Sequence, residues 1–316
     1  MPPPLAAEPP FGGLRRAAKR ALLDVGYYRR QLAQLEFPGA AILCYHSVRG
    51  ADIDVPFADL HVTSETFARH CKLISECCNP VSLADLRAAR AGTHRLPTRP
   101  VIVTFDDGYL GVLEHALPSL ERYRVPAAVF VSTDAVVSRQ HFWFDVLHRR
   151  DGEDAVLNAK RSTFSRWSAI RESLHQDADP HDTHRPMNVH ELERLGASSL
   201  IEIGGHTKTH PTLALAPSDE QRREIEGCRG VLREILRRPV NAFAYPYGSL
   251  RQDYSAETVA IVRETGFELA FTTTASFASL EGDPYEMPRF VMLDSVSDAE
   301  LAHRLLYSWH STGVSR

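Results

Sequence analysis

The stretch VIVTFDDGYL, residues 101–110, joins a run of apolar, mostly β-branched residues to two adjacent carboxylates, Asp106 and Asp107. The apolar run predicts a buried strand. Two like charges side by side at the end of such a strand repel each other, so a cation or a basic side chain has to compensate for them. A DDG sequence is also typical of a plain turn, because Asp and Gly favour turns. The residues at the ends of the neighbouring strands distinguish between a charge-compensated site and a plain turn.

Helices and strands alternate on either side of this stretch. Apolar runs predict further strands at AAILCYHSV, VPAAVFVST, SLIEIGGH, VNAFAYPYG, FELAFTTT and MPRFVML, and helical spacing predicts helices between most of them. This alternation is typical of an α/β fold with a mostly parallel sheet. About seven such units fit a closed or nearly closed barrel.

The chain divides into an N-terminal segment, residues 1–38, and a barrel domain, residues 39–316. Within the barrel, residues 139–190 are charged, histidine-rich and helical in part, which indicates an insertion. Residues 14–35 predict a basic amphipathic helix. Such a helix either contacts an anionic membrane surface or packs on the domain with its basic face in solvent, and the weak, Ala-rich apolar stripe favours the second interpretation.

Composition sets limits on function and location. The 316 residues are 43% hydrophobic and 24% charged, as in ordinary globular proteins, and the net charge of −4 gives no indication of nucleic-acid binding. The five cysteines lack metal-finger spacing and indicate buried thiols in a reducing compartment. We see no secretory signal and no apolar run of the about 20 residues that span a bilayer. A cytoplasmic protein is expected, peripheral to the inner membrane if the basic helix binds lipid.

Four predicted strands end on polar side chains that are unusual in such positions. These side chains are His46, the pair Asp106 and Asp107, His206 and His210 in GGHTKTH, and Tyr247 in YPYG. Because the C-terminal ends of parallel strands meet on one face of a barrel, we expect the side chains to lie together. Each has an ordinary structural explanation by itself, so their joint placement carries the prediction.

Two imidazoles four residues apart and one carboxylate make a three-ligand set of nitrogen and oxygen donors. A catalytic zinc site has this number of protein ligands and leaves one position to water. A dication at His206 and His210 would compensate one carboxylate, and the other would stay ionised to accept a proton from water. Strand geometry hardly decides which Asp does which, because adjacent side chains point to opposite sides.

Together these motifs resemble the polysaccharide deacetylase (NodB-homology) family, the fourth family of carbohydrate esterases, over residues 39–295. TFDDG (104–108) is similar to the family's first motif and HTKTH (206–210) to its second. FAYPYG (243–248) is similar to the third in altered form. The resemblance implies a distorted (β/α)7 barrel that removes N- or O-acetyl groups from sugars with a divalent metal, Zn²⁺ or another cation such as Co²⁺ or Ni²⁺.

The resemblance also implies roles for individual positions. Asp106 would be the general base. The metal ligands would be Asp107, His206 and His210. The backbone N–H of Tyr247 would contribute to an oxyanion hole.

Two departures from the family's pattern concern its acid and its arginine. The acid is usually a His in an L-x-H motif near the end of the domain, but His303 in ELAH falls in a predicted helix past the barrel. Some members are circularly permuted, with this strand at the N-terminus, and ILCYHSV resembles that arrangement. His46 is therefore expected to be the acid, cationic and opposite the base.

The third motif normally begins with an Arg that holds the base. Here Phe243 stands in its place, and Arg289 in MPRF is the candidate for the missing guanidinium.

The sequence thus predicts a metal-dependent hydrolase that removes N-acetyl groups from an amino sugar in a polysaccharide or glycan precursor. Two alternatives stay open: an amide or imide hydrolase with a non-sugar substrate, and a catalytically silent glycan-binding domain. In the insertion, Phe142 and Trp143 either stack on a sugar ring or anchor the insertion to the barrel. Asp145 either binds a hydroxyl or lies at the surface, and the surface position is expected.

Overall fold

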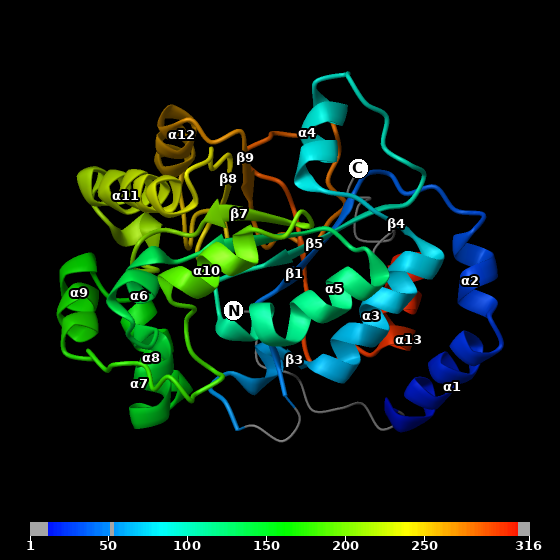
Figure 1. The fold of residues 1–316 in the computed structure, drawn as a ribbon, viewed down its shortest axis with the longest axis horizontal. Helices are drawn as coiled ribbons and strands as arrows, with labels where there is room; N and C mark the ends of the chain where they lie inside the picture. The colour runs from blue at the N-terminus through cyan, green and yellow to red at the C-terminus, as the bar shows by residue number, and fades with distance from the viewer. Residues whose placement is uncertain (1–11, 51–53, 309–316) are drawn as a thin grey trace.

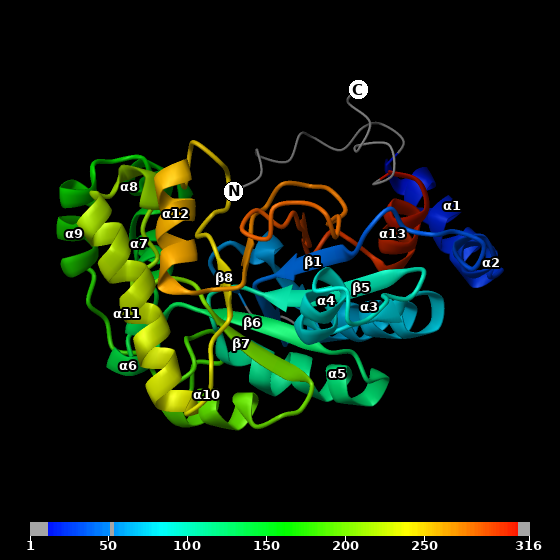
Figure 2. The ribbon, with the colours of Figure 1, turned by 90° about the horizontal axis from the view of Figure 1, so that it is seen from above.

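A parallel sheet forms the centre of the computed structural model, which describes residues 12–50 and 54–308 (Figures 1 and 2). Its strands follow the order β10, β1, β5, β6, β7, β8, β9, and β4 pairs with β5. The bounds are β1 Ala41–Tyr45, β4 Asn79–Pro80, β5 Pro100–Phe105, β6 Ala127–Val131, β7 Ile201–Gly205, β8 Ala242–Ala244, β9 Leu269–Phe271 and β10 Phe290–Val291. Two further short strands, β2 Ser47–Arg49 and β3 His61–Thr63, form a separate parallel pair.

The two ends of the central sheet meet. The Met287 N–H donates to the Ala270 carbonyl and the Thr272 N–H donates to the Met287 carbonyl, both at 2.9 Å, so β9 is bonded to the segment that leads into β10. Because β10 pairs in turn with β1, the strands of the described chain close into a distorted parallel barrel. The predicted fold class is confirmed, and the strand expected near the N-terminus lies between β10 and β5.

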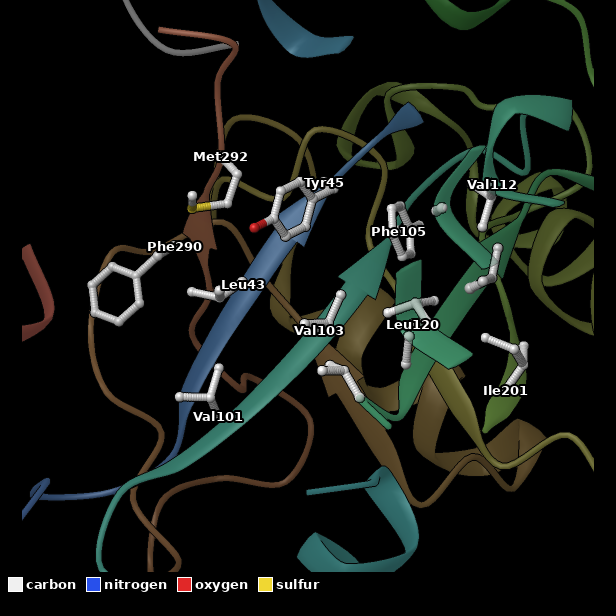
Figure 3. Close-up of a cluster of buried hydrophobic side chains, with 14 of the residues drawn as sticks. Leu43, Tyr45, Val101, Val103, Phe105, Val112, Leu120, Ile201, Phe290 and Met292 are labelled. Atoms are coloured by element: carbon white, nitrogen blue, oxygen red, sulfur yellow. The ribbon is translucent and has the colours of Figure 1, made fainter. Parts of the chain in front are cut away.

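Side chains on both faces of the strands are buried, which explains why the strands read as continuous apolar runs. Figure 3 shows one face, where Leu43, Tyr45, Val103 and Phe105 pack with Leu120 of a neighbouring helix. The other face forms a second buried cluster inside the barrel. It contains Ile42, Ile102, Ala128, Phe130, Ala242, Ala244, Leu269, Phe271 and Met287.

Helices connect most of these strands, as the spacing of apolar residues predicted. They are α3 Ser64–Cys77, α4 Leu83–Arg90, α5 Leu117–Tyr123, α10 Val189–Gly196, α11 Ser218–Leu236, α12 Ala256–Thr265 and α13 Asp298–His303. Short helical turns are η1 Ala58–Leu60, η2 Val112–Ala116, η3 Leu213–Leu215 and η4 Arg304–Ser308. Side chains fix several starts: Ser82 with Asp85 forms a capping box at α4, and Asn188 with Glu191 forms one at α10.

Four helices, α6 Thr133–Ser138, α7 Trp143–Asp151, α8 Glu153–Lys160 and α9 Phe164–Glu172, stand together beside the barrel (Figure 1). The last three fall within the predicted insertion. They have a hydrophobic cluster of their own, which buries Phe142, Trp143 and Trp167. Of the two interpretations of Phe142 and Trp143, the structure therefore supports the anchor. The domain boundaries drawn from the sequence stay predictions.

The prediction of a single N-terminal helix is wrong, because this segment forms two helices, α1 Gly12–Asp24 and α2 Tyr27–Leu32. Gly26 separates them with φ 72, in the left-handed region that glycine tolerates. Helix α1 packs against α13, where Lys19 pairs with Glu300 at 2.5 Å. Among the described residues, no helix combines the length and the apolar character needed to cross a bilayer.

Two glycines test how tightly the barrel is packed. A Cβ on Gly204 of β7 would lie 2.5 Å from the Phe130 ring and 2.7 Å from the Ala242 carbonyl oxygen, whereas a Cβ on Gly230 of α11 would meet nothing within 4 Å. We expect Gly204→Ala to lower the free energy of unfolding by about 1–3 kcal/mol through overpacking. Gly230→Ala should raise it by about 0.5–1 kcal/mol, since glycine is a poor residue inside a helix. Urea denaturation measures both, and equal effects would contradict the packing described here.

Candidate metal centre and active site

The residues singled out at the strand ends lie around one cavity of about 310 Å³. Each follows a different strand of the barrel or shares a loop with another candidate. The six candidates on the cavity wall are His46 after β1, Asp106 and Asp107 after β5, His206 and His210 after β7, and Tyr247 after β8. The parallel barrel brings these loops together because all its strands end on the same side.

Asp107, His206 and His210 meet at one point of this cavity. The Nε2 atoms of His206 and His210 lie 3.5 and 3.4 Å from the same carboxylate oxygen, Oδ1 of Asp107. All three side chains are buried, and their ligand atoms lie within 4.8 Å of one another. Within residues 12–50 and 54–308, no other group of three His, Cys, Asp or Glu side chains is so arranged.

The hydrogen bonds around these three residues fit a bound cation. The Nδ1 atom of His206 lies 2.8 Å from the Ala244 carbonyl, so Nδ1 carries the proton and Nε2 of the neutral ring turns its lone pair toward Asp107. The Asp107 Oδ1 atom is buried without a hydrogen-bond partner. A lone pair and a carboxylate oxygen that face each other repel, unless a cation or a second proton lies between them. Two nitrogens and one carboxylate are a donor set that zinc accepts.

Glu224 of α11 holds the loop that carries both histidines. Its carboxylate accepts from the Lys208 N–H at 2.8 Å, the Thr209 N–H at 2.9 Å and the Thr209 hydroxyl at 2.6 Å. Within this loop Thr207 and His210 have φ values of 66 and 60, which are unfavourable for residues other than glycine. Asp107 (φ 73) and Tyr247 (φ 62) share this conformation. Strained backbone of this kind is typical of functional sites, where surrounding contacts maintain it.

Arg289 forms a two-pronged ion pair with Asp106, with both nitrogen–oxygen distances at 2.7 Å. Its Nε donates to the Thr272 carbonyl at 2.9 Å, and its side chain is fully buried. Burial by itself would raise the pKa of Asp106, but the guanidinium and the nearby imidazoles outweigh it and hold the pKa well below its usual range. The guanidinium expected near the base is therefore present, supplied from the residue before β10. Phe243, at the position of the family's usual Arg, packs in the core.

His46 lies on the cavity wall, and its buried Nδ1 has no hydrogen-bond partner among the described residues. Burial lowers the pKa of His46, although the carboxylates of Asp107 and Asp106 oppose this effect. The lowered pKa disfavours the cationic form of the imidazole, which the sequence predicted. To act as an acid, it would first have to gain a proton during the reaction.

Tyr247 is held on both sides. Its ring packs edge-on against His210, with the centroids 4.7 Å apart, and Nζ of Lys160 lies 3.9 Å from its centroid. Lys160, the last residue of α8, also pairs with the buried Asp253 at 2.9 Å. The Tyr247 carbonyl accepts from the Thr273 hydroxyl at 2.8 Å. The insertion therefore reaches the candidate site and fixes one of its residues.

Two residues of the insertion differ from what the sequence suggested. Phe144, one position beyond the aromatic pair that the sequence singled out, lines the cavity, and its ring centroid lies 5.1 Å from that of His210. The expectation of a surface Asp145 is wrong, since this residue is fully buried and accepts from the Tyr109 hydroxyl at 2.9 Å. Burial raises the pKa of Asp145 to about 8. An acid directly after an aromatic run and before two aliphatic residues was the available signal for its burial.

Comparison with known proteins identifies related sequences. The sequence profile of the family described as polysaccharide deacetylase matches residues 93–270, more than half of the chain. The poly-beta-1,6-N-acetyl-D-glucosamine N-deacetylase of Escherichia coli (strain K12) is 23% identical over 286 residues, which cover 87% of this chain and 40% of the relative. The chain therefore spans less than half the length of that relative.

Solved structures show a similar fold. The deacetylase PplD of Streptococcus pyogenes, solved in complex with acetate, has a TM-score of 0.61 at 18% identity, and the match covers 84% of this chain and 98% of that one. IcaB from Ammonifex degensii also has a TM-score of 0.61, at 22% identity, and the match covers 86% and 99% of the two chains. At these identities the likeness shows the barrel fold.

The ion pair of Arg289 predicts a large loss of stability when one partner is removed. Arg289→Met keeps most of the buried volume but leaves the Asp106 carboxylate buried without compensation, so we expect the free energy of unfolding to fall by about 3–5 kcal/mol. The loss should shrink as the pH falls toward the unfolded-state pKa of Asp106. Without the guanidinium, burial raises the pKa of Asp106 above its unfolded value, and the folded variant then gains stability by taking up a proton as the pH falls.

Urea denaturation of both proteins at several pH values measures this difference. Arg223→Met is the matched control, because Arg223 forms its ion pairs with Asp219 and Glu220 on the exposed face of α11. Its unfolding midpoint should equal that of the wild type. A loss for Arg289→Met that stayed constant with pH would show that Asp106 does not titrate as described.

Proposed function

This chain belongs to the polysaccharide deacetylase family, and from that premise we propose that it is a metal-dependent hydrolase that removes N-acetyl groups from an amino sugar in a polysaccharide or glycan precursor. The observation that carries the proposal is an ionised, arginine-paired Asp106 next to the Asp107–His206–His210 cluster in one cavity. A relative whose name describes N-deacetylation of poly-beta-1,6-N-acetyl-D-glucosamine supports a sugar substrate.

Asp107, His206 and His210 would hold the divalent cation, with zinc as the first candidate and Co²⁺ or Ni²⁺ as substitutes. When bound, such a cation supplies a Lewis acid for the acetyl carbonyl and makes a neighbouring water easier to deprotonate. The Ala244 carbonyl keeps the proton of His206 on Nδ1, so Nε2 stays available as a ligand atom.

Asp106 is the proposed general base. Arg289 fixes both of its oxygens, so the carboxylate is oriented before the substrate binds. The same contact lowers the pKa of Asp106 and makes it a weak base. A weak base suffices only for a water that is already acidified, which explains why the proposal needs the neighbouring cation site.

His46 and Tyr247 complete the proposed mechanism from the cavity wall. An amide anion is a poor leaving group, so the nitrogen has to be protonated as the carbon–nitrogen bond breaks. His46, on the cavity wall, would donate this proton after it has itself gained one during the reaction. The Tyr247 N–H is the proposed donor to the developing oxyanion, a contribution of about 3 kcal/mol for a well-aimed group. Thr273 and Lys160 keep Tyr247 in position.

Two alternatives from the sequence analysis are distinguishable by experiment. An amide or imide hydrolase with a non-sugar substrate would open cyclic ureides and release no acetate from acetylated sugars. A silent glycan-binding domain would bind oligosaccharides without turnover. A binding domain needs neither a base nor an acid, and the cavity contains side chains suited to both roles.

We predict that the purified protein releases acetate from N-acetylglucosamine oligomers, that a chelator abolishes this release, and that added zinc restores it. The physical reason is that Asp106, with its lowered pKa, cannot deprotonate an ordinary water fast enough. An enzymatic acetate assay with and without chelator measures the effect. Undiminished release after complete metal removal would contradict the metal-dependent proposal.

Two matched substitutions separate the base from the ligand. Asp106→Asn should lower kcat by about 10²- to 10⁴-fold while zinc stays bound. Asp107→Asn should lose the zinc as well, which equilibrium dialysis with metal analysis detects. If Asp106→Asn kept full turnover, the activity would have to come from another protein in the preparation or from a different base.

We also propose that the N-terminal helices contact an anionic membrane surface, which would suit a lipid-linked substrate. Leu14 and Val25 are 77% and 66% exposed on or just after α1, and Arg15, Arg29 and Arg30 are exposed near them. Exposed apolar side chains among arginines are typical of segments that bind anionic lipid. The expected cytoplasmic location stays a prediction.

Vesicle binding tests this contact. The double substitution Leu14→Glu, Val25→Glu should weaken partitioning to phosphatidylglycerol-containing vesicles by about tenfold or more, because two apolar side chains no longer enter the interface. Sedimentation with vesicles measures the bound fraction, and phosphatidylcholine vesicles provide the uncharged control. If the wild-type protein bound neither kind of vesicle, the result would contradict the membrane proposal.

A further inference from the structure

On one side of the cavity, the segment before β3 packs against helix α7. Phe57, just before η1, and Phe144 of α7 both line the cavity, and their ring centroids lie 6.5 Å apart. Phe57 also packs edge-on against His148 of α7 at 4.4 Å. In Figure 1 the segment that leads to β3 lies beside α7.

The order of the strands shows where this contact lies. Phe57 belongs to the segment between β2 and β3, which follows β1 in the chain, and Phe144 belongs to the insertion after β6. Strand β5, with the Asp106–Asp107 pair, lies between β1 and β6 in the barrel. The two aromatic rings therefore join the walls on either side of the β5 loop and block a passage over it.

The opposite part of the cavity wall has smaller side chains. Ser249 follows β8, Thr273 follows β9, and Val291 belongs to β10. Tyr247 of the β8 loop is the large side chain on this part of the wall, and its ring packs against His210 of the β7 loop. A polymer that is processed along its length needs a groove open at both ends, and the contact between Phe57 and Phe144 stands across one of these ends.

The size of the pocket agrees with this description. A volume of about 310 Å³ is at the lower end of the range for small-molecule sites. A single sugar ring with its acetyl group is a ligand of suitable size for this volume. The rings of Phe57 and Phe144 offer apolar faces of the kind on which the carbon–hydrogen face of a sugar packs.

The backbone of Phe57 gives independent support to a functional position for this ring. Its φ of 52 places a bulky residue in the left-handed region, which costs free energy and which glycine or asparagine would occupy more easily. The contacts with Phe144 and His148 offset this cost. A phenylalanine in such a strained position is best explained by what its ring does in the cavity wall.

We propose that this site accepts one N-acetylated sugar at the end of a glycan, or a single such sugar on a carrier, and excludes the interior sugars of a long polymer. The inference rests on the proposed deacetylase function and specifies its substrate class. The blocked side at Phe57 and Phe144 would force a longer chain to end in the pocket.

Product analysis of defined oligomers tests the proposal. The wild-type protein, loaded with zinc, is incubated to completion with N-acetylglucosamine pentamers of β-1,6 and β-1,4 linkage, and tandem mass spectrometry counts and locates the lost acetyl groups. We expect one acetyl group to be lost per chain, at a terminal sugar. Loss from interior sugars would overturn the inference and leave the deacetylase function standing. No acetate from any oligomer would overturn the function itself.

The substitution Phe57→Ala should open the blocked side. We expect the variant protein to remove more than one acetyl group per pentamer, including acetyl groups of interior sugars. Phe164→Ala is the matched control, since Phe164 is half-buried like Phe57 but packs on Trp167 away from the cavity, and it should keep the wild-type product pattern. Circular dichroism shows whether both variants fold. A folded Phe57→Ala protein that still released one terminal acetyl group would overturn the role assigned to this ring. The wild-type pattern alone tests the substrate class if that variant does not fold.

Discussion

The buried ion pair between Arg289 and Asp106 is the interaction on which the rest of the site depends. Arg289 precedes β10 and Asp106 follows β5, so the guanidinium reaches past β1, which lies between these strands. It also binds the Thr272 carbonyl after β9 and packs over the rings of Phe130 and Phe271 inside the barrel. A charge pair in an apolar interior is tolerable only when both partners are fully satisfied. Asp106 of the TFDDG motif can therefore stay charged in the interior only when the closed barrel brings Arg289 to it.

With Asp106 compensated by arginine, the second carboxylate still lacks a partner. Asp107 faces the Nε2 atoms of His206 and His210, and its Oδ1 atom makes no hydrogen bond with the described residues. The two adjacent carboxylates are thus stabilised in different ways, one by a fixed guanidinium and the other by a cluster suited to a dication. This difference is the physical basis for assigning them different chemical roles.

The insertion after β6 contributes more than a surface feature. Phe144 forms part of the cavity wall, and Lys160 packs on Tyr247 and pairs with Asp253. The barrel supplies the chemistry, while the insertion and the loop before β3 determine the shape of the space around it.

The sequence by itself determined the alternation of strands and helices and the polar residues at the strand ends, because apolar periodicity and short motifs are local properties. It also named Arg289, but only the tertiary structure showed that this side chain reaches Asp106 across 183 residues of chain. The contact between Phe57 and Phe144 was equally hidden. Both contacts depend on which distant segments pack together, and local sequence does not encode the distance between residues that meet only when the barrel closes. The break at Gly26 and the burial of Asp145 had local signals, a glycine and an acid directly after an aromatic run, which the sequence analysis did not use.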